Sequence, residues 1–405
     1  MKKLLQFLPF WLFMVLFKFA GGLHYSLLST LGERIMPLWL VGLTVGGSAL
    51  GQMLLDIKAG SLLDRFGYKR LLQLTTALFA LAGMSLAFGL TTATYLLSVF
   101  GSTFGWLFFG PGVNAYILSQ APSGGTGKFI SLRDVSGSAG LVISCAVLPV
   151  VIALAPHQIG ILLVIAFMCA FAAVSLSPTD SKAMRERSAS RVQTYAQTLA
   201  AVRRMNPAST VLLLLNFVAA MFYGTIWFVV PLVISQQAHA GLLGWGLGVF
   251  DFTVVVLGFS LGTLADKIDR RTLVFFGLLL FACSVALLGW NFGWLFLLFG
   301  FLATTGDEMA GVSLWSWLHS LDHEHAHDGT LAGVLNVGED FGWTVGPAWA
   351  GFAYGLVGPS WSIALAAVPI AFTLCIFLVM SKNRGLTSVA PTSRPRKPHK
   401  RRHRG

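Results

Sequence analysis

The chain has 405 residues, of which 55% are hydrophobic and 11% are charged, with a formal net charge of +12. Soluble domains average roughly 45–50% apolar and 25% charged residues, so these values exclude an ordinary soluble globular protein. A bilayer-spanning helix needs about 20 mostly apolar residues, and the chain has room for roughly a dozen. We therefore expect an all-α, multi-pass integral membrane protein.

Apolar stretches bounded by Gly, Pro and charged residues predict twelve transmembrane helices. The first follows Lys2 and Lys3 and resembles a signal peptide. Its apolar run continues through Lys18 to about Leu31 with no small-residue cleavage site, which favours an uncleaved span. The predicted spans are residues 8–31, 37–58, 71–90, 95–119, 129–153, 158–176, 208–235, 242–263, 273–290, 294–318, 331–356 and 360–380.

The connecting loops alternate in charge. Residues 91–94, 155–158 and 236–240 carry no Lys or Arg, whereas the loops between them are basic. Of the 28 Lys and Arg residues, all except Lys18 and Arg34 lie on or near one side, and positive loops mark the cytoplasmic side of a membrane. We expect both termini in the cytoplasm, and a bacterial plasma (inner) membrane as the location.

The longest polar segment, about Ser177 to Ala208, divides the spans into six and six. The two halves also repeat at an offset of 202 residues, which pairs Gly22 with Gly224 and Gly140 with Gly342. Parallel repeats of this kind are typical of transporters that work by alternating access. The predicted organisation is an N-terminal six-helix bundle (1–180), a central cytoplasmic loop (181–207), a C-terminal six-helix bundle (208–380) and a basic disordered tail (381–405).

A motif of Gly, Asp and basic residues repeats between the second and third spans of each half. The segment Gly60-x-Leu62-x-Asp64-Arg65-x-Gly67-x-Lys69-Arg70 resembles the signature loop of the major facilitator superfamily, and residues 262–271 resemble its second copy. The resemblance implies two pseudo-symmetric six-helix bundles and a secondary transporter. It also implies that the loop gates the cytoplasmic side. The gating candidates are Gly60, Asp64, Arg65, Gly67, Arg70, Gly262, Asp266, Lys267 and Arg270.

The resemblance to drug/proton antiporters is partial. The fourth span lacks the buried Arg of many proton-coupled members, and the fifth lacks the full Gly-Pro-Gly-Gly pattern, which residues 342–347 approach more closely. Our leading hypothesis is proton-coupled efflux of a small organic solute. The alternative within the class is a proton-coupled uptake symporter, and a non-transporting sensor is a rival from another class.

Charged residues inside the spans are the best site candidates, because each costs roughly 2.5–3.5 kcal/mol near the bilayer centre and needs a cavity or a partner. Asp251, Asp307, Glu308 and Asp340 are candidates for proton coupling. Lys18 is a candidate to contact an anionic group of the substrate or to act as a counter-ion. The competing interpretation is a permanent structural ion pair, with Asp251 as a strut between the halves.

The resemblance implies a cavity lined chiefly by spans one, four, seven and ten. On these spans Trp106, Phe222, Tyr223 and Trp227 are candidates to stack on an apolar substrate, and Asn114 and Asn216 are candidates to hydrogen-bond it. The alternative for the aromatic residues is a core or lipid-facing position. The alternative for the two Asn residues is a hydrogen bond to a neighbouring helix.

The loop before span eleven contains His323-Glu324-x-x-His327, which satisfies the zinc-protease pattern and makes a membrane zinc protease a remote alternative. His323, His325 and His327 are weak metal candidates, and we expect a polar connector without catalytic residues, metal or cofactor. No GxxxxGK[ST] motif is present, which argues against direct use of ATP.

Nine basic residues and no acidic ones fall in the last 24 positions. This tail has almost nothing to bury, and anionic lipid is its expected partner. The other expected partners are a small-molecule substrate and protons. We expect no nucleic-acid binding and a monomeric protein. The four Cys residues lie in apolar runs without CxxC spacing, so they predict no disulfide framework.

Overall fold

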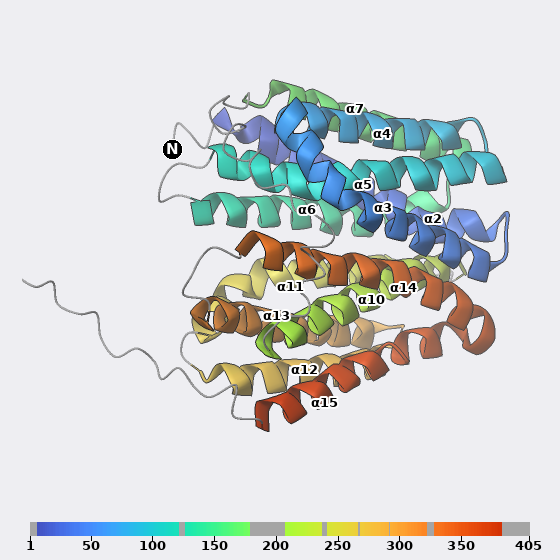
Figure 1. The fold of residues 1–405 in the computed structure, drawn as a ribbon. Helices are drawn as coiled ribbons and strands as arrows, with labels where there is room; N and C mark the ends of the chain where they lie inside the picture. Colours follow the sequence, from blue (N-terminus) through green and yellow to red (C-terminus); the bar gives the residue numbers. More distant parts are fainter. Residues whose placement is uncertain are drawn as a thin grey trace, which may run out of the picture.

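The computed structural model describes residues 6–120, 126–178, 207–236, 241–265, 268–290, 292–321 and 328–382. These residues form helices and no strands, six in each of two bundles that lie side by side (Figure 1). The first bundle contains α2 (Leu8–Glu33), α3 (Leu38–Phe66), α4 (Tyr68–Ala87), α5 (Thr92–Gln120), α6 (Thr126–Ile152) and α7 (Pro156–Leu176). The second contains α10 (Pro207–Gln236), α11 (Gly241–Ala265), α12 (Arg270–Leu288), α13 (Trp294–Leu321), α14 (Asp328–Ala364) and α15 (Ala367–Lys382).

Nine of the described helices are long and apolar enough to cross a membrane, and α14 with α15 form a further pair bent by 42°. The long helix α14 is broken at Gly358, whose φ of 79° lies in the left-handed region. Trp349 Nε1 donates a hydrogen bond to the carbonyl oxygen of Ser362 at 3.2 Å, so the segments before and after Gly358 lie side by side. The chain therefore reverses at Gly358, and helical segments lie on both sides of it, where the spans 331–356 and 360–380 are predicted.

Large apolar side chains cover the outer surface of both bundles. Leu97, Val150 and Phe372 are each at least 65% exposed. Other aromatic side chains fill the inside of each bundle, such as Phe17 and Phe79 in the first, which are fully buried. Soluble monomers rarely expose extended apolar surface, so this distribution indicates a protein surrounded by lipid.

The glycines that the sequence repeat pairs occupy equivalent helix contacts. A Cβ at Gly22 would lie 2.5 Å from Ser144 Oγ on α6, and one at Gly140 would collide with the carbonyl oxygen of Val15 on α2. In the second bundle, Gly224 packs against the Pro347 ring on α14, and Gly342 packs against the backbone of α10. Small residues let helix backbones approach closely in membranes. The repeat therefore encodes one helix pair in each half, α2 with α6 and α10 with α14.

The first copy of the signature motif is mostly helical rather than a loop. The second span was expected to end near residue 58, but α3 continues to Phe66 and only Gly67, with φ 90°, separates it from α4. Asp269 occupies the equivalent place before α12, where its side chain accepts a hydrogen bond from the Thr272 amide at 3.2 Å. Glycine thus provides a left-handed turn in one half, and aspartate provides a helix cap in the other.

Most of the gating candidates carry no described side chain, so their predicted gating role stays a prediction. Asp266 and Lys267 lie outside the described residues, and the side chains of residues 56–65 and of Gly262 are likewise outside them. Lys69 is described: its Nζ donates to the carbonyl oxygens of Ser175 and Ser177, at 2.8 and 2.5 Å. A cation at the end of α7 complements the negative end of the helix dipole.

The two bundles meet along symmetry-related helix pairs, α3 with α14 and α6 with α11. Gly42 lies against the carbonyl oxygen of Pro347 and against Gly351, and Gly46 lies against the carbonyl oxygen of Thr344. Gly244 packs similarly on Cys145 and Pro149. These contacts lie toward the side where α2 ends and α3 begins, which we call the sealed side. The side that carries Leu8 and Lys382, the outer ends of the first and last helices, is called the terminal side.

Substituting Gly46 with Val should weaken the sealed arrangement, because the new side chain collides with the backbone of α14 at a cost of about 1–3 kcal/mol. The matched control is Gly47→Val one residue later, where an added Cβ meets nothing within 4 Å. Spin labels on a cysteine-free variant at Leu43 of α3 and Phe352 of α14, both exposed, report the separation. We expect longer distances for Gly46→Val only; equal distances in both variants would contradict the proposed contact.

Candidate functional site

A cavity of about 940 Å³ lies between the two bundles. Its wall includes residues of α2 and α5 in the first bundle and of α10 and α13 in the second, the four helices that the resemblance implies. Residues of α3, α6, α11 and α14 complete the wall. Drug-sized ligands occupy pockets of roughly 300–1,000 Å³, so the cavity has room for a small organic molecule.

Three aromatic side chains meet on the part of the cavity wall that is nearer the sealed side. Tyr25 of α2 contacts Trp343 of α14 edge to face, with ring centroids 5.5 Å apart, and Trp227 of α10, at 6.5 Å. All three rings line the cavity and come from both bundles. Toward the terminal side the wall includes Asn114, near the end of α5, and Arg133, near the start of α6. The wall residues therefore reach toward the terminal side, whereas the close glycine contacts between the bundles lie toward the sealed side.

Lys18 lies at the centre of the site. Its Nζ lies over the rings of Trp106 and Phe109, 5.1 and 5.3 Å from their centroids. Gly137 and Gly140 on α6 leave room for its stem, since an added Cβ would lie 3.6 and 3.1 Å from it. The ammonium group is attracted by Asp251 and Glu339 of the second bundle. Because its closest ring contacts lie in its own bundle and its acidic partners in the other, Lys18 links the two halves electrostatically.

The acidic groups of the cavity are held in different ways. Tyr223 Oη donates a hydrogen bond to Asp307 Oδ2 at 2.9 Å, and Glu308 follows Asp307 on α13. Ser138 Oγ of α6 donates to Asp251 Oδ1 of α11 at 3.5 Å, across the bundle interface. The strut predicted for Asp251 thus has a hydrogen-bonding partner in the opposite bundle.

Arg133 is neutralised within its own bundle. Its Nη2 lies 2.6 Å from Asp134 Oδ1, and its Nε donates to the same oxygen at 2.8 Å. Its Nη1 donates to Asn114 Oδ1 on α5. Asn114 therefore lies on the cavity wall but already has a protein partner.

The structure brings most of the predicted site residues together. Two of the predicted aromatic and amide candidates do not line the cavity: Phe222 is fully buried in the core of the second bundle between Phe250 and Phe281, and Asn216 lies elsewhere on α10. One step along a helix turns a side chain by about 100°. Phe222 therefore points away from the wall, whereas Tyr223, the next residue and also a stacking candidate, lines it. Those that line the wall are Lys18, Trp106, Asn114, Trp227, Asp251, Asp307, Glu308 and Asp340.

Several wall residues were absent from the predicted set. Tyr25, Ser138 and Trp343 carry no charge, so the cost of burial in a membrane does not single them out. Arg133 and Asp134 are charged but fall near the predicted inner end of their span, where charge is less unusual, and Glu339 directly precedes the predicted Asp340. Their proximity to Lys18 depends on how the helices cross.

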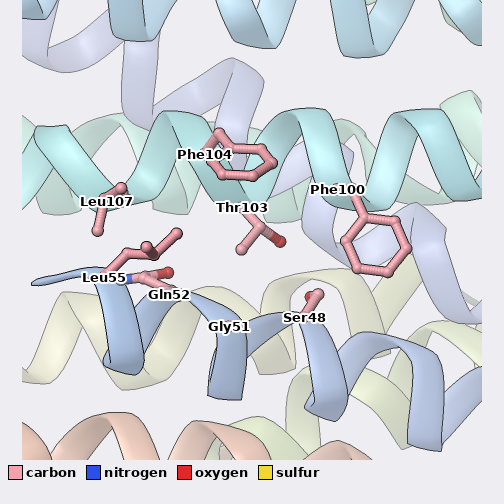
Figure 2. Close-up of a pocket in the computed structure, with 8 residues that line it drawn as sticks. All are labelled: Ser48, Gly51, Gln52, Leu55, Phe100, Thr103, Phe104 and Leu107. Atoms are coloured by element: carbon pink, nitrogen blue, oxygen red, sulfur yellow. The ribbon is translucent and has the colours of Figure 1, made fainter.

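A smaller recess adjoins the cavity between α3 and α5. Figure 2 shows Ser48, Gln52 and Leu55 on α3 facing Phe100, Thr103 and Leu107 on α5. Phe100 and Phe104 are nearly half exposed on the outer surface, whereas Ser48, Gln52 and Thr103 also line the central cavity. The wall between the cavity and the surrounding lipid is therefore thin at this position.

The histidine loop and its metal-site hypothesis lie outside the described residues, because residues 322–327 are not among them. Among the residues that are described, no group of three or more His, Cys, Asp or Glu side chains is placed to hold a metal ion.

Comparisons with known proteins agree with this architecture. The family model described as Major Facilitator Superfamily matches residues 212–404. No curated protein matches the sequence. Among solved structures, the chain is similar to the human organic anion transporter MFSD10 (TETRAN), with 16% identity, a TM-score of 0.62, and coverage of 91% of this chain and 98% of the other.

Two further solved structures are similar over nearly the whole chain. The nucleoside transporter NupG has 12% identity and a TM-score of 0.69, covering 94% of this chain and 99% of its own. A POT family transporter in complex with a thioalcohol-conjugated peptide also has 12% identity and a TM-score of 0.69, covering 94% and 96%. At these identities the likeness establishes the fold.

The match of residues 212–404 to the family model places the second half of the chain in the major facilitator superfamily, a family of multi-pass membrane transporters. The paired six-helix bundles, the apolar outer surface and the central cavity agree with this class, and the whole chain shares the fold of the similar solved structures.

Removing the Lys18 charge should destabilise the protein, because the carboxylates of Asp251 and Glu339 lose their central cation. We expect Lys18→Met and Asp251→Asn each to lower the melting temperature in detergent. The loss of stability in the double variant should be smaller than the sum of the two single losses by about 0.5–3 kcal/mol. Lys69→Met, which removes a cation outside the cavity, should combine additively with Asp251→Asn. If the effects of Lys18→Met and Asp251→Asn were also additive, the charges of Lys18 and Asp251 would not interact.

Proposed function

We propose that the chain is a proton-coupled efflux transporter of a small organic solute. The solute moves through the central cavity as residues 1–180 rock against residues 208–380. Support comes from the cavity between two symmetry-related bundles and from the short contacts on one side of it only, among the described residues. The close glycine contacts of α3 with α14 join the two bundles on the sealed side, where a transporter that works by alternating access must open.

The adjacent carboxyl groups of Asp307 and Glu308 are the observation that carries the coupling. Both line the cavity, on α13. The described groups that act on them are Tyr223, Asp134 and Glu339, none of which carries a positive charge. Because two neighbouring negative charges in an apolar setting need neutralisation, a proton can hold this site until a solute displaces it. An exchange of this kind links the movement of the solute to the movement of the proton.

The expected orientation is compatible with transport in either direction. If the basic loops face the cytoplasm, the terminal side is cytoplasmic and the cavity extends toward it. This is the loading state of an exporter, and it is equally the release state of an importer. Uptake by symport is therefore the alternative that transport measurements must decide. The names of the similar structures cover an organic anion, nucleosides and a peptide, so the fold does not choose the solute.

The remaining proposals concern the surroundings of the transporter. We place it in a bacterial inner membrane, with both termini cytoplasmic, as a monomer. The basic residues after position 381 are proposed to bind anionic lipid, at about 1 kcal/mol for each charge near the surface.

Replacing Asp307 with Asn, or Glu308 with Gln, should abolish proton coupling while leaving the fold intact, because each change removes a titratable group at nearly constant shape. Cells that express the chain are first screened with a panel of organic compounds for altered accumulation, with and without a proton gradient. A compound that responds is then tested with purified protein in vesicles containing a pH-sensitive dye.

The matched control is Asp269→Asn, which removes a carboxyl outside the cavity and keeps the helix cap, since Asn caps as well as Asp. We expect solute-dependent proton movement in the wild type and the control, and its loss in both cavity variants. Undiminished proton movement in both cavity variants would overturn the assignment of coupling to this pair. Accumulation that rises with expression would favour uptake over efflux.

A further inference from the structure

The formal charges of the cavity are strongly unbalanced. Six acidic residues line it: Asp134, Asp251, Asp307, Glu308, Glu339 and Asp340. The basic residues on the described wall are Lys18 and Arg133. Five of the six acids come from the second bundle, whereas both bases come from the first. The wall formed by α11, α13 and α14 is therefore acidic, although the chain as a whole carries a net charge of +12.

The two bases are already engaged with acids. Arg133 pairs with Asp134 in its own bundle. Lys18 is attracted by Asp251 and Glu339 from across the cavity. Neither base is among the groups that act on Asp307 or Glu308. Among the described residues, neither Lys18 nor Arg133 forms an ion pair within 4 Å with these two acids.

The aromatic residues of the cavity are suited to a positive charge. The ammonium of Lys18 already lies over two of the rings, Trp106 and Phe109, at distances typical of cation–π contacts. Tyr25, Trp227 and Trp343 present further rings at the sealed end. A flat or aromatic group can pack among these rings while its charge lies near the acids.

We propose that the transported solute is an organic cation with an aromatic or apolar body, bound with its positive charge at Asp307 and Glu308 and its body against Trp227 and Trp343. This proposal rests on the transport function proposed above and adds the class of solute. An anion of the same shape is repelled by the acidic wall, and a neutral analogue gains packing without the electrostatic attraction, which is strong in a cavity of low dielectric constant.

Three probes with phenyl groups separate charge from shape. Tetraphenylphosphonium is a cation, tetraphenylborate is an anion of nearly the same shape, and triphenylphosphine oxide is neutral. Binding of each to the purified full-length protein in detergent is measured by equilibrium dialysis, with empty micelles subtracted. We expect the phosphonium to bind at least about tenfold more tightly than either of the others, since like-charge placement costs several kcal/mol. Equal or tighter binding of the borate or the oxide overturns the proposal.

Variants assign the charge to its position. The double variant Asp307→Asn with Glu308→Gln should weaken phosphonium binding about tenfold or more and leave binding of the neutral oxide unchanged. Asp269→Asn should change neither. The elution profile and melting temperature check that each variant is folded. Because the comparison of the three probes uses the wild type, a misfolded variant does not remove the test.

The outcomes also separate this proposal from the proposed function. Solute-driven proton movement without preference for the phosphonium rejects the cationic class and retains the coupled transporter. Selective phosphonium binding that the double variant loses, in a protein that moves no protons, supports the cation site and rejects proton coupling.

Discussion

A charged side chain inside an apolar helix needs water or another charge beside it, and this requirement organises the centre of the molecule. Lys18, Asp251, Asp307 and Glu339 come from four different helices, yet they all line one cavity. The folded state would be less stable if any of these charges faced lipid. The arrangement of the bundles around a common polar centre therefore follows from the same cost that makes the charges rare in the sequence.

Glycine determines how closely the helices around this centre approach. Within each bundle, repeated glycines join α2 to α6 and α10 to α14, and the first of these contacts also makes room for Lys18. Between the bundles, Gly42 and Gly46 allow α3 to lie against the backbone of α14. The first kind of contact holds a bundle together. The second kind is confined, among the described residues, to one side of the cavity, as expected of a joint that opens.

The two halves share a fold but not a charge. They share a sequence repeat, with equivalent glycines and equivalent helix pairs. The acidic residues, however, are concentrated on the part of the cavity wall that the second half forms, and the basic residues on the part that the first half forms. Attraction between unlike walls favours closure around the cavity. It also means that a solute or a proton that neutralises the acidic wall alters how strongly the halves attract each other, which connects occupancy to conformation.

The sequence by itself determined the class of protein, the twelve helices, the twofold repeat and the charged candidates. These depend on local composition and on a regular offset, and both can be read along one dimension. Lys18, Asp307 and Glu308 could be selected as candidates for the cavity wall, because a charge inside a span is rare enough to identify each residue singly.

Only the tertiary structure decided which neutral residues face the cavity and which charges face each other. Phe222 and Tyr223 are adjacent in sequence, yet the first lies in the bundle core and the second binds Asp307, because one step along a helix turns a side chain by about 100°. The ring contact between Tyr25 and Trp343 joins residues more than 300 positions apart. The angle at which two bundles meet sets such pairs, and no local pattern in the chain records that angle.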